Sequence, residues 1–201
     1  MTNMQSQLRS IIHDDLTLEV SLIHEAIPVP GPEEVLVEIQ AAPINPSDLL
    51  LLLGPVDPES IRIEKQSESP VVLGKIFEKA RGMIDGRIGQ SMVVGNEGAG
   101  LVVDAGKSDV AQALKGRMVG VFGGGMYTQY RCLNVNQCLP LLEGTTAEQG
   151  ASCFVNPMTA LGMVETMRME GHTALVHTAA ASNLGQMLNR LCLSDGIGLT
   201  N

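Results

Sequence analysis

The sequence predicts a mainly β barrel followed by an incomplete α/β segment, and three observations support this fold class. Apolar and polar residues alternate over residues 16–48, which is the two-residue period of half-buried strands. From about residue 143 the apolar residues recur at helical spacing instead. A short apolar strand at 173–177 then precedes a helix and the opening of a second strand, and a crossover of this kind predicts a parallel pair. We therefore expect a β domain over residues 1–142 and an α/β segment over residues 143–201.

Composition excludes several classes of protein. The 201 residues carry a net charge of −9, which disfavours a nucleic-acid surface because such a surface needs clustered Lys and Arg. Four cysteines without CxxC spacing indicate reduced thiols and a cytoplasmic protein. The longest pure apolar run, Leu49–Leu53, is far shorter than the ~20 residues that cross a bilayer. We therefore expect neither a nucleic-acid partner nor a membrane span.

The β part begins with LTLEVSLI (16–23) and EVLVEIQA (34–41), which alternate as strands and predict a hairpin-like start. The segment IPVPGPEE between them has the turn chemistry of three prolines and a glycine. Residues 55–92 break the alternation and are interpreted as a surface insertion that contains a short amphipathic helix, with a mobile loop as the alternative. The predicted helix places three apolar residues on one face: Val72, Ile76 and Ala80.

The glycine-rich stretch VVGNEGAGLVV (93–103) resembles a phosphate loop or half of a metal site at first sight. A phosphate loop needs a helix directly after it, so that free N–H groups face the anion. A strand follows here instead, and residues 104–106 end it with turn chemistry. We therefore expect Gly95, Gly98 and Gly100 to serve backbone angles or close packing.

Helix signals mark the second part of the chain. A capping box is predicted at Thr145–Glu148, and Asn156–Pro157 predicts the start of a second helix with Asn at the cap. The segment TAAASNLGQ (178–186) follows an apolar strand and opens a helix, which is the context of a dinucleotide-binding loop. An ordinary strand-to-helix turn remains the alternative. The helix after it carries an apolar stripe formed by Leu184, Met187, Leu188 and Leu191.

Five segments in this order resemble the zinc-independent medium-chain dehydrogenases/reductases of the quinone-oxidoreductase and enoyl-reductase type. They are PGPEEVLVEIQAAPINPSD (30–48), VVGNEGAG (93–100), GRMVGVFGGGMYTQY (116–130), VNPMTALGM (155–163) and VHTAAASNLGQ (176–186). The resemblance implies a GroES-like catalytic barrel followed by a Rossmann nucleotide-binding domain, which this chain only begins.

The resemblance also implies that the protein binds no zinc. Zinc-dependent relatives have Cys where Asn45 stands and His where Asn96 stands, and they carry a four-cysteine structural lobe that this sequence lacks. Neutral amides are poor ligands for Zn²⁺. Glu97 alone cannot hold a catalytic metal, so GNEGAG is expected to be a turn near the active cleft.

The cofactor that the resemblance implies is NADPH. NADH is not excluded, because the ribose-selecting residues fall at or beyond Asn201. Asn45 is expected beside the nicotinamide, with a plain N-cap as its alternative role, and Asn156 carries the same ambiguity with capping favoured. Thr159 corresponds to the threonine near the nicotinamide carboxamide, although a threonine inside a helix also bonds the preceding turn. The pyrophosphate is expected along the variant AxxGxxG loop, at Ala179, Ala180, Ser182, Leu184 and Gly185.

A catalytic residue cannot be assigned from the sequence. Tyr130 could donate a proton, although a packed tyrosine with a satisfied hydroxyl is the favoured interpretation. Enoyl-reductase relatives carry a tyrosine soon after the NPSD motif, where this chain has LLLLLGPVDP, so reduction of an enoyl thioester is disfavoured.

Together these features predict the N-terminal part of a zinc-free, NADPH-dependent oxidoreductase that reduces a quinone or a conjugated carbonyl such as an enone. We expect residues 1–201 alone to bind NADPH weakly or not at all, to be inactive, and to associate into homo-oligomers through residues 173–199, where the apolar stripe is left partly uncovered. The alternative is a truncated or degenerate barrel module that binds a partner or ligand without turnover.

Overall fold

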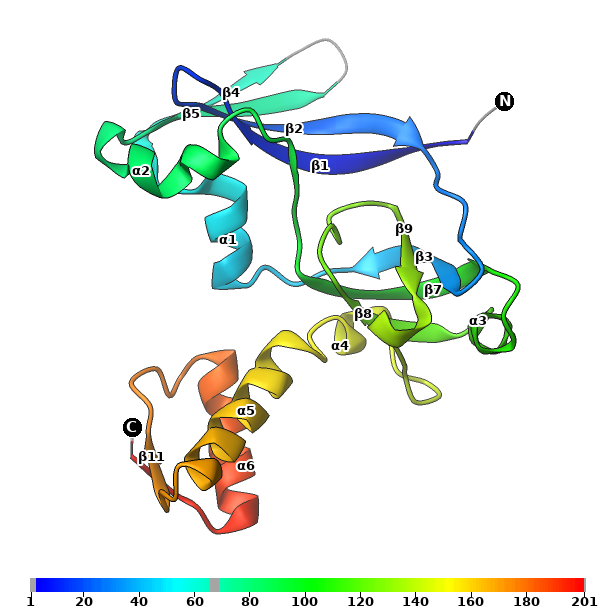
Figure 1. The fold of residues 1–201 in the computed structure, drawn as a ribbon, viewed down its shortest axis with the longest axis vertical. Helices are drawn as coiled ribbons and strands as arrows, with labels where there is room; N and C mark the ends of the chain where they lie inside the picture. The colour runs from blue at the N-terminus through cyan, green and yellow to red at the C-terminus, as the bar shows by residue number, and fades with distance from the viewer. Residues whose placement is uncertain (1–2, 66–68, 201) are drawn as a thin grey trace. The chain divides into compact units, whose positions relative to one another are not determined.

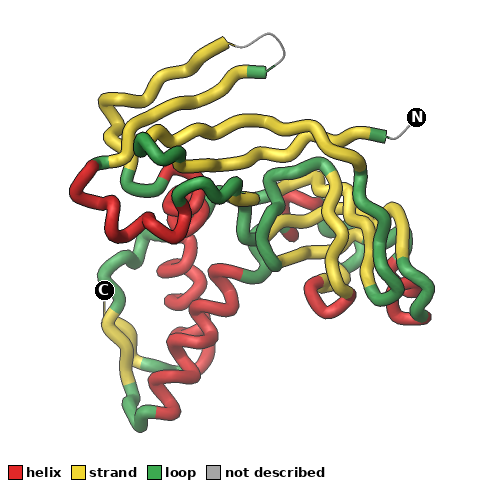
Figure 2. Tube along the Cα trace, turned by 45° about the horizontal axis from the view of Figure 1, so that its top comes forward, coloured by secondary structure: helices red, strands yellow, loops and turns green. Residues whose placement is uncertain are grey.

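The computed structural model describes residues 3–65 and 69–200, and its contacts divide the chain into two compact units, residues 1–151 and residues 152–201. Strands are the main secondary structure of the first unit, whereas helices are that of the second (Figure 2). This mainly β unit with an α/β segment after it is the predicted fold class. Residue 201, on which part of the ribose-selection hypothesis rests, lies outside the described residues.

The first unit contains two antiparallel five-stranded sheets, and sheet A has the order β4-β5-β2-β1-β6 (Figure 1). Its strands are β1 (Met4–Ile12), β2 (Thr17–Ala26), β4 (Val56–Lys65), β5 (Pro70–Ile76) and β6 (Met92–Val93). Strand β1 has no counterpart in the sequence prediction. Three of its four buried positions, Gln5, Gln7 and Ser10, are polar and only Ile12 is apolar, so the strand lacks an apolar stripe.

The predicted insertion over residues 55–92 is wrong in its secondary structure. Val72 and Ile76 lie on β5, which pairs with β2 and β4, and not on a helix. Helical turns occur only after this strand, as η1 (Glu78–Ala80), α2 (Arg81–Ile84) and η2 (Asp85–Arg87). A short apolar run fits either period, and here the β-branched valines and the sheet edge that β2 offers favour a strand.

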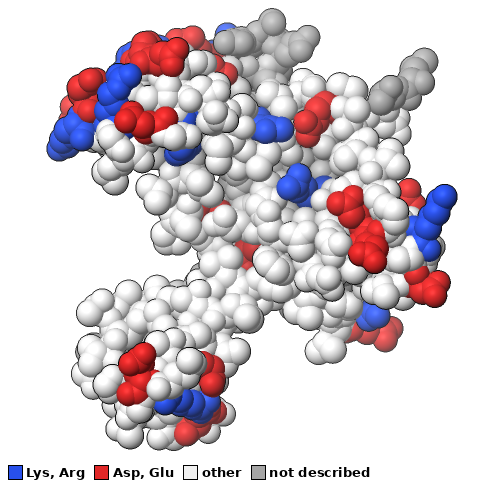
Figure 3. Space-filling view, in the orientation of Figure 1, with Lys and Arg blue, Asp and Glu red and all other residues white. Residues whose placement is uncertain are grey.

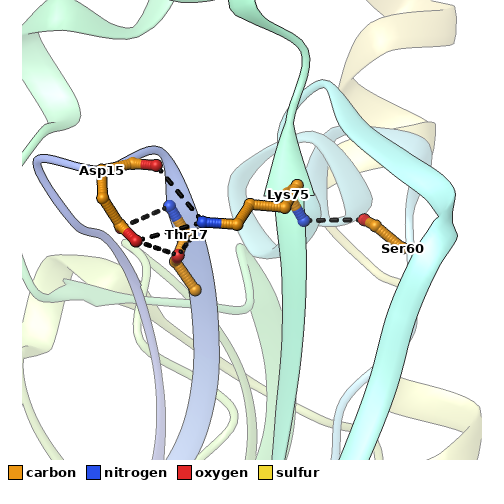
Figure 4. Close-up of polar contacts among 4 residues, drawn as sticks. All are labelled: Asp15, Thr17, Ser60 and Lys75. Carbon is orange, nitrogen blue, oxygen red and sulfur yellow. Dashed lines mark hydrogen bonds and ion pairs between the residues drawn. The ribbon is translucent and has the colours of Figure 1, made fainter.

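A polar cluster joins β2, β4 and β5 at the surface (Figure 4). The Lys75 ammonium donates to Asp15 Oδ2 at 3.1 Å and to Thr17 Oγ1 at 2.7 Å, while the Lys75 backbone N–H donates to Ser60 Oγ at 2.7 Å. Hydrogen bonds from the side chain and backbone of Thr17, together with Lys75, hold the pKa of Asp15 well below its usual range. The cluster thus links three neighbouring strands.

Sheet B has the order β10-β8-β7-β3-β9. Its strands are β3 (Glu34–Ala41), β7 (Glu97–Ala105), β8 (Met118–Phe122), β9 (Tyr130–Asn134) and β10 (Cys138–Pro140). The predicted hairpin is therefore wrong, because β2 pairs within sheet A and β3 pairs within sheet B. The proline-rich segment between them cannot donate a full ladder of hydrogen bonds, so it carries the chain from one sheet to the other.

Each sheet has its own apolar core. Ile12, Leu18 and Ile76 are buried in the core of sheet A, and Val35, Val102 and Val119 are buried in the core of sheet B. On the face in Figure 3, Lys and Arg are interspersed with Asp and Glu rather than gathered into a basic patch. The described residues contain no helix long and apolar enough to span a membrane.

The remaining helices of the first unit are α1 (Pro46–Leu53), α3 (Asp109–Leu114), η3 (Val135–Gln137) and α4 (Ala147–Gly150). The cap of α4 is Thr146, with Gln149 as its reciprocal partner, one residue later than the predicted Thr145–Glu148 box. Ala147 and Ala151 pack against Ala99 of sheet B. These contacts place residues 143–151 with the first unit, so the contact boundary falls after residue 151 and not after residue 142.

The second unit consists of α5 (Val155–Met169), β11 (Ala174–Val176), α6 (Asn183–Asp195) and β12 (Gly198–Thr200). As predicted, β11 and β12 are parallel. The N-cap of α5 is Phe154, so the predicted cap at Asn156 is wrong, and Asn156 lies in the first turn. Pro157 is tolerated there because the first N–H groups of a helix have no intrahelical acceptor.

Candidate functional site

Asn45 is the N-cap of α1, and its position follows from the sequence around it. Its extended backbone (φ −88°, ψ 156°) precedes Pro46, whose fixed φ suits the first helical position. The Asn45 backbone N–H donates to Asp48 Oδ2 at 2.8 Å, which is one half of a capping box. The predicted capping role of Asn45 is therefore confirmed.

The side chain of Asn45 has a second, buried partner. Its Nδ2 donates to Glu97 Oε1 at 2.9 Å, and the two side chains come from α1 and β7 of the same unit. Asn45 is 6% exposed and Glu97 is 0% exposed. Because a carboxylate only accepts hydrogen bonds, this contact fixes which end of the Asn45 amide faces Glu97. The amide is thus held in one orientation at the start of α1.

Asp48 joins α1 to the turn that precedes β7. It is 1% exposed, and its Oδ1 accepts from the Asn96 backbone N–H at 2.8 Å while Oδ2 accepts from Asn45. Asn96 Nδ2 in turn donates to Ser47 Oγ at 2.9 Å. Two buried carboxylates therefore organise this end of the unit. Sequence reasoning missed Asp48, whose signal is an acid at the third helical position of NPSD, and it considered Glu97 only as a metal ligand.

The glycines of GNEGAG have the predicted packing and backbone roles. Gly95 has φ +93°, and a Cβ there would lie 2.7 Å from Tyr127 Cδ1. A Cβ on Gly98 would lie 2.9 Å from the Ala41 carbonyl oxygen, and one on Gly100 would overlap the Glu38 carbonyl. The turn itself is shorter than predicted, because β7 begins at Glu97 and includes Gly98 and Gly100.

Tyr127, and not Tyr130, lies beside this polar network. Its hydroxyl donates to the Pro43 carbonyl oxygen at 2.9 Å. Burial, together with the nearby Asp48 carboxylate, raises the pKa of Tyr127 to about 12. The sequence offered no signal for this residue beyond the presence of two tyrosines.

Tyr130 lies on β9 and faces a different carboxylate. Its hydroxyl donates to Glu38 Oε1 at 3.2 Å. The negative charge of Glu38 raises the pKa of Tyr130, so the phenol is a weaker acid than a free tyrosine. The weak candidacy of Tyr130 as a proton donor stays a prediction.

The residues at the two positions where zinc-dependent relatives carry metal ligands do not fit that metal. The amides of Asn45 and Asn96 are held by Glu97 and Ser47, and neutral amides are poor ligands for Zn²⁺. Within residues 3–65 and 69–200, no group of three or more His, Cys, Asp or Glu side chains could hold a metal ion.

In the second unit, the Thr159 side chain makes a hydrogen bond within its own helix, α5. Its hydroxyl donates to the Val155 carbonyl oxygen at 2.6 Å, which is the within-helix bond that the sequence analysis kept as its alternative. Thr159 also lines an apolar cavity of about 580 Å³ together with Met163, Met167 and Leu175. A role of Asn156 and Thr159 toward a cofactor stays a prediction.

The loop before α6 has a capped rather than an open glycine-rich form. Ser182 is the N-cap: its Oγ accepts from the Gly185 N–H at 3.0 Å and donates to the Ala179 carbonyl at 2.7 Å. The Ser182 hydroxyl, which the sequence predicts as a donor to the pyrophosphate, therefore donates within the loop, to the Ala179 carbonyl oxygen. A Cβ on Gly185 would overlap the carbonyl oxygens of Ala179 and Ala180, so only glycine allows the helix to lie this close to the loop.

The residue before this loop also has an unpaired polar atom. The His177 backbone N–H donates to the Thr200 carbonyl at 2.9 Å, which continues the pairing of β11 with β12. Its Nδ1 is buried and has no partner in the described part of the chain.

A two-sheet β unit with an Asn-capped helix, followed by a β-α-β unit whose helix begins at a tight glycine, defines the architecture of a medium-chain dehydrogenase/reductase. The comparisons with known proteins agree. The alcohol dehydrogenase GroES-like domain matches residues 31–143, more than half of the chain, and the protein belongs to that family.

Solved structures show the same fold. A candidate NADPH:quinone reductase from Mesorhizobium loti is 27% identical with a TM-score of 0.68, and the match covers 99% of this chain and 54% of that one. A mycobacterial protein complexed with NADPH is 18% identical (TM-score 0.62; 97% and 50% covered), and a Pseudomonas syringae quinone oxidoreductase is 16% identical (TM-score 0.62; 97% and 51% covered). The chain thus spans about half the length of these structures.

Proposed function

We propose that this chain is the N-terminal part of a zinc-free, NADPH-dependent oxidoreductase that transfers hydride to a quinone or a conjugated carbonyl. The observation that carries the proposal is the buried Asn45–Glu97 contact, next to Asp48. It places an oriented amide, rather than a metal ligand, at the start of α1. A group held in one orientation by buried partners is suited to positioning a reactant, which is how a protein assists cofactor chemistry.

The second unit supports the cofactor part of the proposal. The tight approach of Gly185 to Ala179 and Ala180 is the helix–loop packing that a dinucleotide loop requires of its last glycine. In this proposal Ala179, Ala180, Ser182, Leu184 and Gly185 hold the pyrophosphate. The roles of Asn45, Asn156 and Thr159 toward the nicotinamide remain the predictions made from the sequence. The cofactor, when bound, supplies the hydride, and these residues bind and orient the cofactor.

The test measures NADPH oxidation by a product that contains residues 1–201 together with the rest of its nucleotide domain. A quinone and an enone serve as acceptors, and Asn45→Ala is compared with Asn136→Ala, an exposed asparagine of the same unit. We expect Asn45→Ala to lower the rate roughly tenfold or more, because orientation is lost, and Asn136→Ala to leave it unchanged.

Two results would contradict the proposal. Equal activity of the Asn45→Ala and Asn136→Ala variants would remove Asn45 from the site. About one zinc ion per chain after dialysis against a chelator, measured by elemental analysis, would overturn the zinc-free assignment.

A binding module without turnover is the second candidate, and the cap formed by Ser182 favours it. Ser182 stands where the family pattern has a glycine, and its hydroxyl at the N-terminus of α6 accepts the hydrogen bond of the Gly185 N–H. If this candidate is correct, the longer product binds its partner but oxidises no NADPH with either acceptor. A cytoplasmic location and a homo-oligomeric state remain parts of the proposal.

A further inference from the structure

A polar cavity of about 240 Å³ lies within the first unit, between β1, the end of β2 and β9. Its volume equals that of about eight water molecules at ~30 Å³ each. Six polar or charged residues take part in its lining: Gln5, Gln7, Arg9, Glu25, Tyr130 and Arg131. None of them belongs to the network around Asn45.

Three residues that line this cavity each carry a buried polar atom without a partner. Gln7 is only 3% exposed, and its Oε1 has no hydrogen bond within the described residues. The Nε atoms of Arg9 and Arg131 are buried and equally unpaired there. Buried polar groups are nearly always hydrogen-bonded, so one acceptor and two donors left over in one cavity indicate a missing partner.

The charges around the cavity do not balance. Arg9 Nη2 lies 3.6 Å from Glu25 Oε2, and Glu25 Oε1 also accepts from Gln5 Nε2 at 3.2 Å. Arg131 makes no ion pair with any residue that the structure describes. The Tyr130 hydroxyl donates to Glu38. The lining therefore leaves one positive charge without a counterion, on the side where Arg131 stands.

We propose that this cavity is a binding site for a small carboxylate that also carries a hydroxyl donor. The carboxylate oxygens accept from the Nε–H groups of Arg9 and Arg131, and the ligand hydroxyl donates to Gln7 Oε1. Guanidinium groups form strong, charge-assisted hydrogen bonds with carboxylates, and this one ligand would satisfy all three unpaired atoms. The site is independent of the proposed hydride transfer.

The test titrates the 201-residue chain with three probes and follows the amide signals by NMR. Lactate has both the carboxylate and the hydroxyl, propionate lacks the hydroxyl, and lactamide lacks the charge. We expect lactate to bind with a dissociation constant on the order of millimolar, as suits so small a molecule, and to bind more tightly than both other probes. The signals that shift should be those of β1 and β9.

Variants test separately the recognition of the carboxylate and the recognition of the hydroxyl. Arg131→Met should weaken lactate and propionate alike, by roughly tenfold or more. Gln7→Met should weaken lactate until it matches propionate and leave propionate unchanged. Arg62→Met is the matched control, because Arg62 lies on β4 and, among the residues that the structure describes, pairs only with Glu64, at 3.0 Å. Circular dichroism checks that each variant is folded.

The comparison of probes on the unaltered chain keeps the proposal testable if a variant does not fold. Equal binding of lactate and lactamide would overturn it, as would equal effects of Arg131→Met and Arg62→Met. Binding of inorganic phosphate without binding of lactate would overturn the assignment to a carboxylate.

Discussion

Asn45 makes two kinds of contact, of which the sequence predicts only the helix cap. Its backbone and position cap α1, while its amide donates to Glu97 at 2.9 Å in a site where both side chains are almost fully buried. A lone buried carboxylate is costly, so Glu97 depends on the donors around it. The residue that orients the proposed site is therefore also a residue that stabilises the fold.

Asn45→Ala is expected to lower the free energy of unfolding by about 1–3 kcal/mol, because Glu97 Oε1 loses the Asn45 donor inside the protein. Urea denaturation followed by circular dichroism measures the change. Asn136→Ala, at an exposed position of η3, should cost less than ~0.5 kcal/mol. Equal losses in the two variants would show that the buried contact has no energetic weight.

Tyr127 gives a pH-dependent signature of the same network. Its pKa is raised from 10.0 to about 12 by burial and by the nearby Asp48, so the folded protein keeps this proton more tightly than the unfolded chain does. The stabilisation is therefore complete below pH 10 and is lost as the pH rises toward 12.

We expect an alkaline titration of tyrosinate absorbance to show a component near pH 12 that disappears in Tyr127→Phe. Tyr127→Phe should also reduce the loss of stability above pH 10. If the variant retains the whole component, Tyr127 does not lie in the environment described here.

At the scale of elements, β7 lies so close to β3 that side chains are excluded between them. A Cβ on Gly98 would lie 2.9 Å from the Ala41 carbonyl, and a Cβ on Gly100 would overlap the carbonyl of Glu38. One of the two register shifts in the pairing of β3 with β7, between Ile39 and Ala41, occurs at the same place. Close packing of this kind fixes Glu97, the first residue of β7, opposite α1.

Gly100→Ala is expected to destabilise the protein by about 3 kcal/mol or more, because the backbone of β3 must move to admit the new methyl group. Gly82→Ala is the matched control. No atom lies within 4 Å of its added Cβ, and an alanine within α2 should raise stability by up to ~1 kcal/mol. Denaturation midpoints compare the two, and similar values would contradict the packing described for β7.

The elements that the sequence predicts well are those with strong local signals. Helix α6 is predicted by its apolar stripe and by the residues at its ends, Ser182 at the N-cap and Gly196 after the last turn. The parallel pair β11 and β12 is predicted by the helix that connects the two strands. The pairing of strands is different, because it depends on residues far apart in the chain. Neither the placement of β2 and β3 in separate sheets nor the polar-lined β1 has a local signal.

In the candidate site, too, the sequence predicts local features and does not predict contacts between residues far apart in the chain. Local sequence predicts that Asn45 caps a helix, because Asn-Pro precedes an apolar run. The same signal at Asn156–Pro157 gives the wrong cap, because α5 begins earlier, at Val155. The contact of Asn45 with Glu97 joins residues 52 positions apart, and it cannot be predicted from spacing. Tyr127 and the cavity between β1 and β9 require the folded structure for the same reason.

At the scale of the whole molecule, the chain divides into a β unit with two cores and a small α/β unit with its own core. The predicted apolar stripe of α6 is packed within this small unit, where Leu188 is 1% exposed. Other apolar side chains are exposed instead: Met158, Leu161, Met169, Val176 and Leu193. We therefore expect any self-association of the chain to use these residues rather than the stripe.

The proposed function treats residues 1–201 as the N-terminal part of an oxidoreductase, so that the second unit is the start of a nucleotide-binding domain. Such domains bind a dinucleotide at the carboxyl ends of several parallel strands, and the second unit has two, β11 and β12. Calorimetric titration of the 201-residue chain with NADPH, with its mass in solution measured in parallel, tests this claim most directly. The account predicts weak or absent binding, whereas micromolar affinity in a strictly monomeric chain would contradict it.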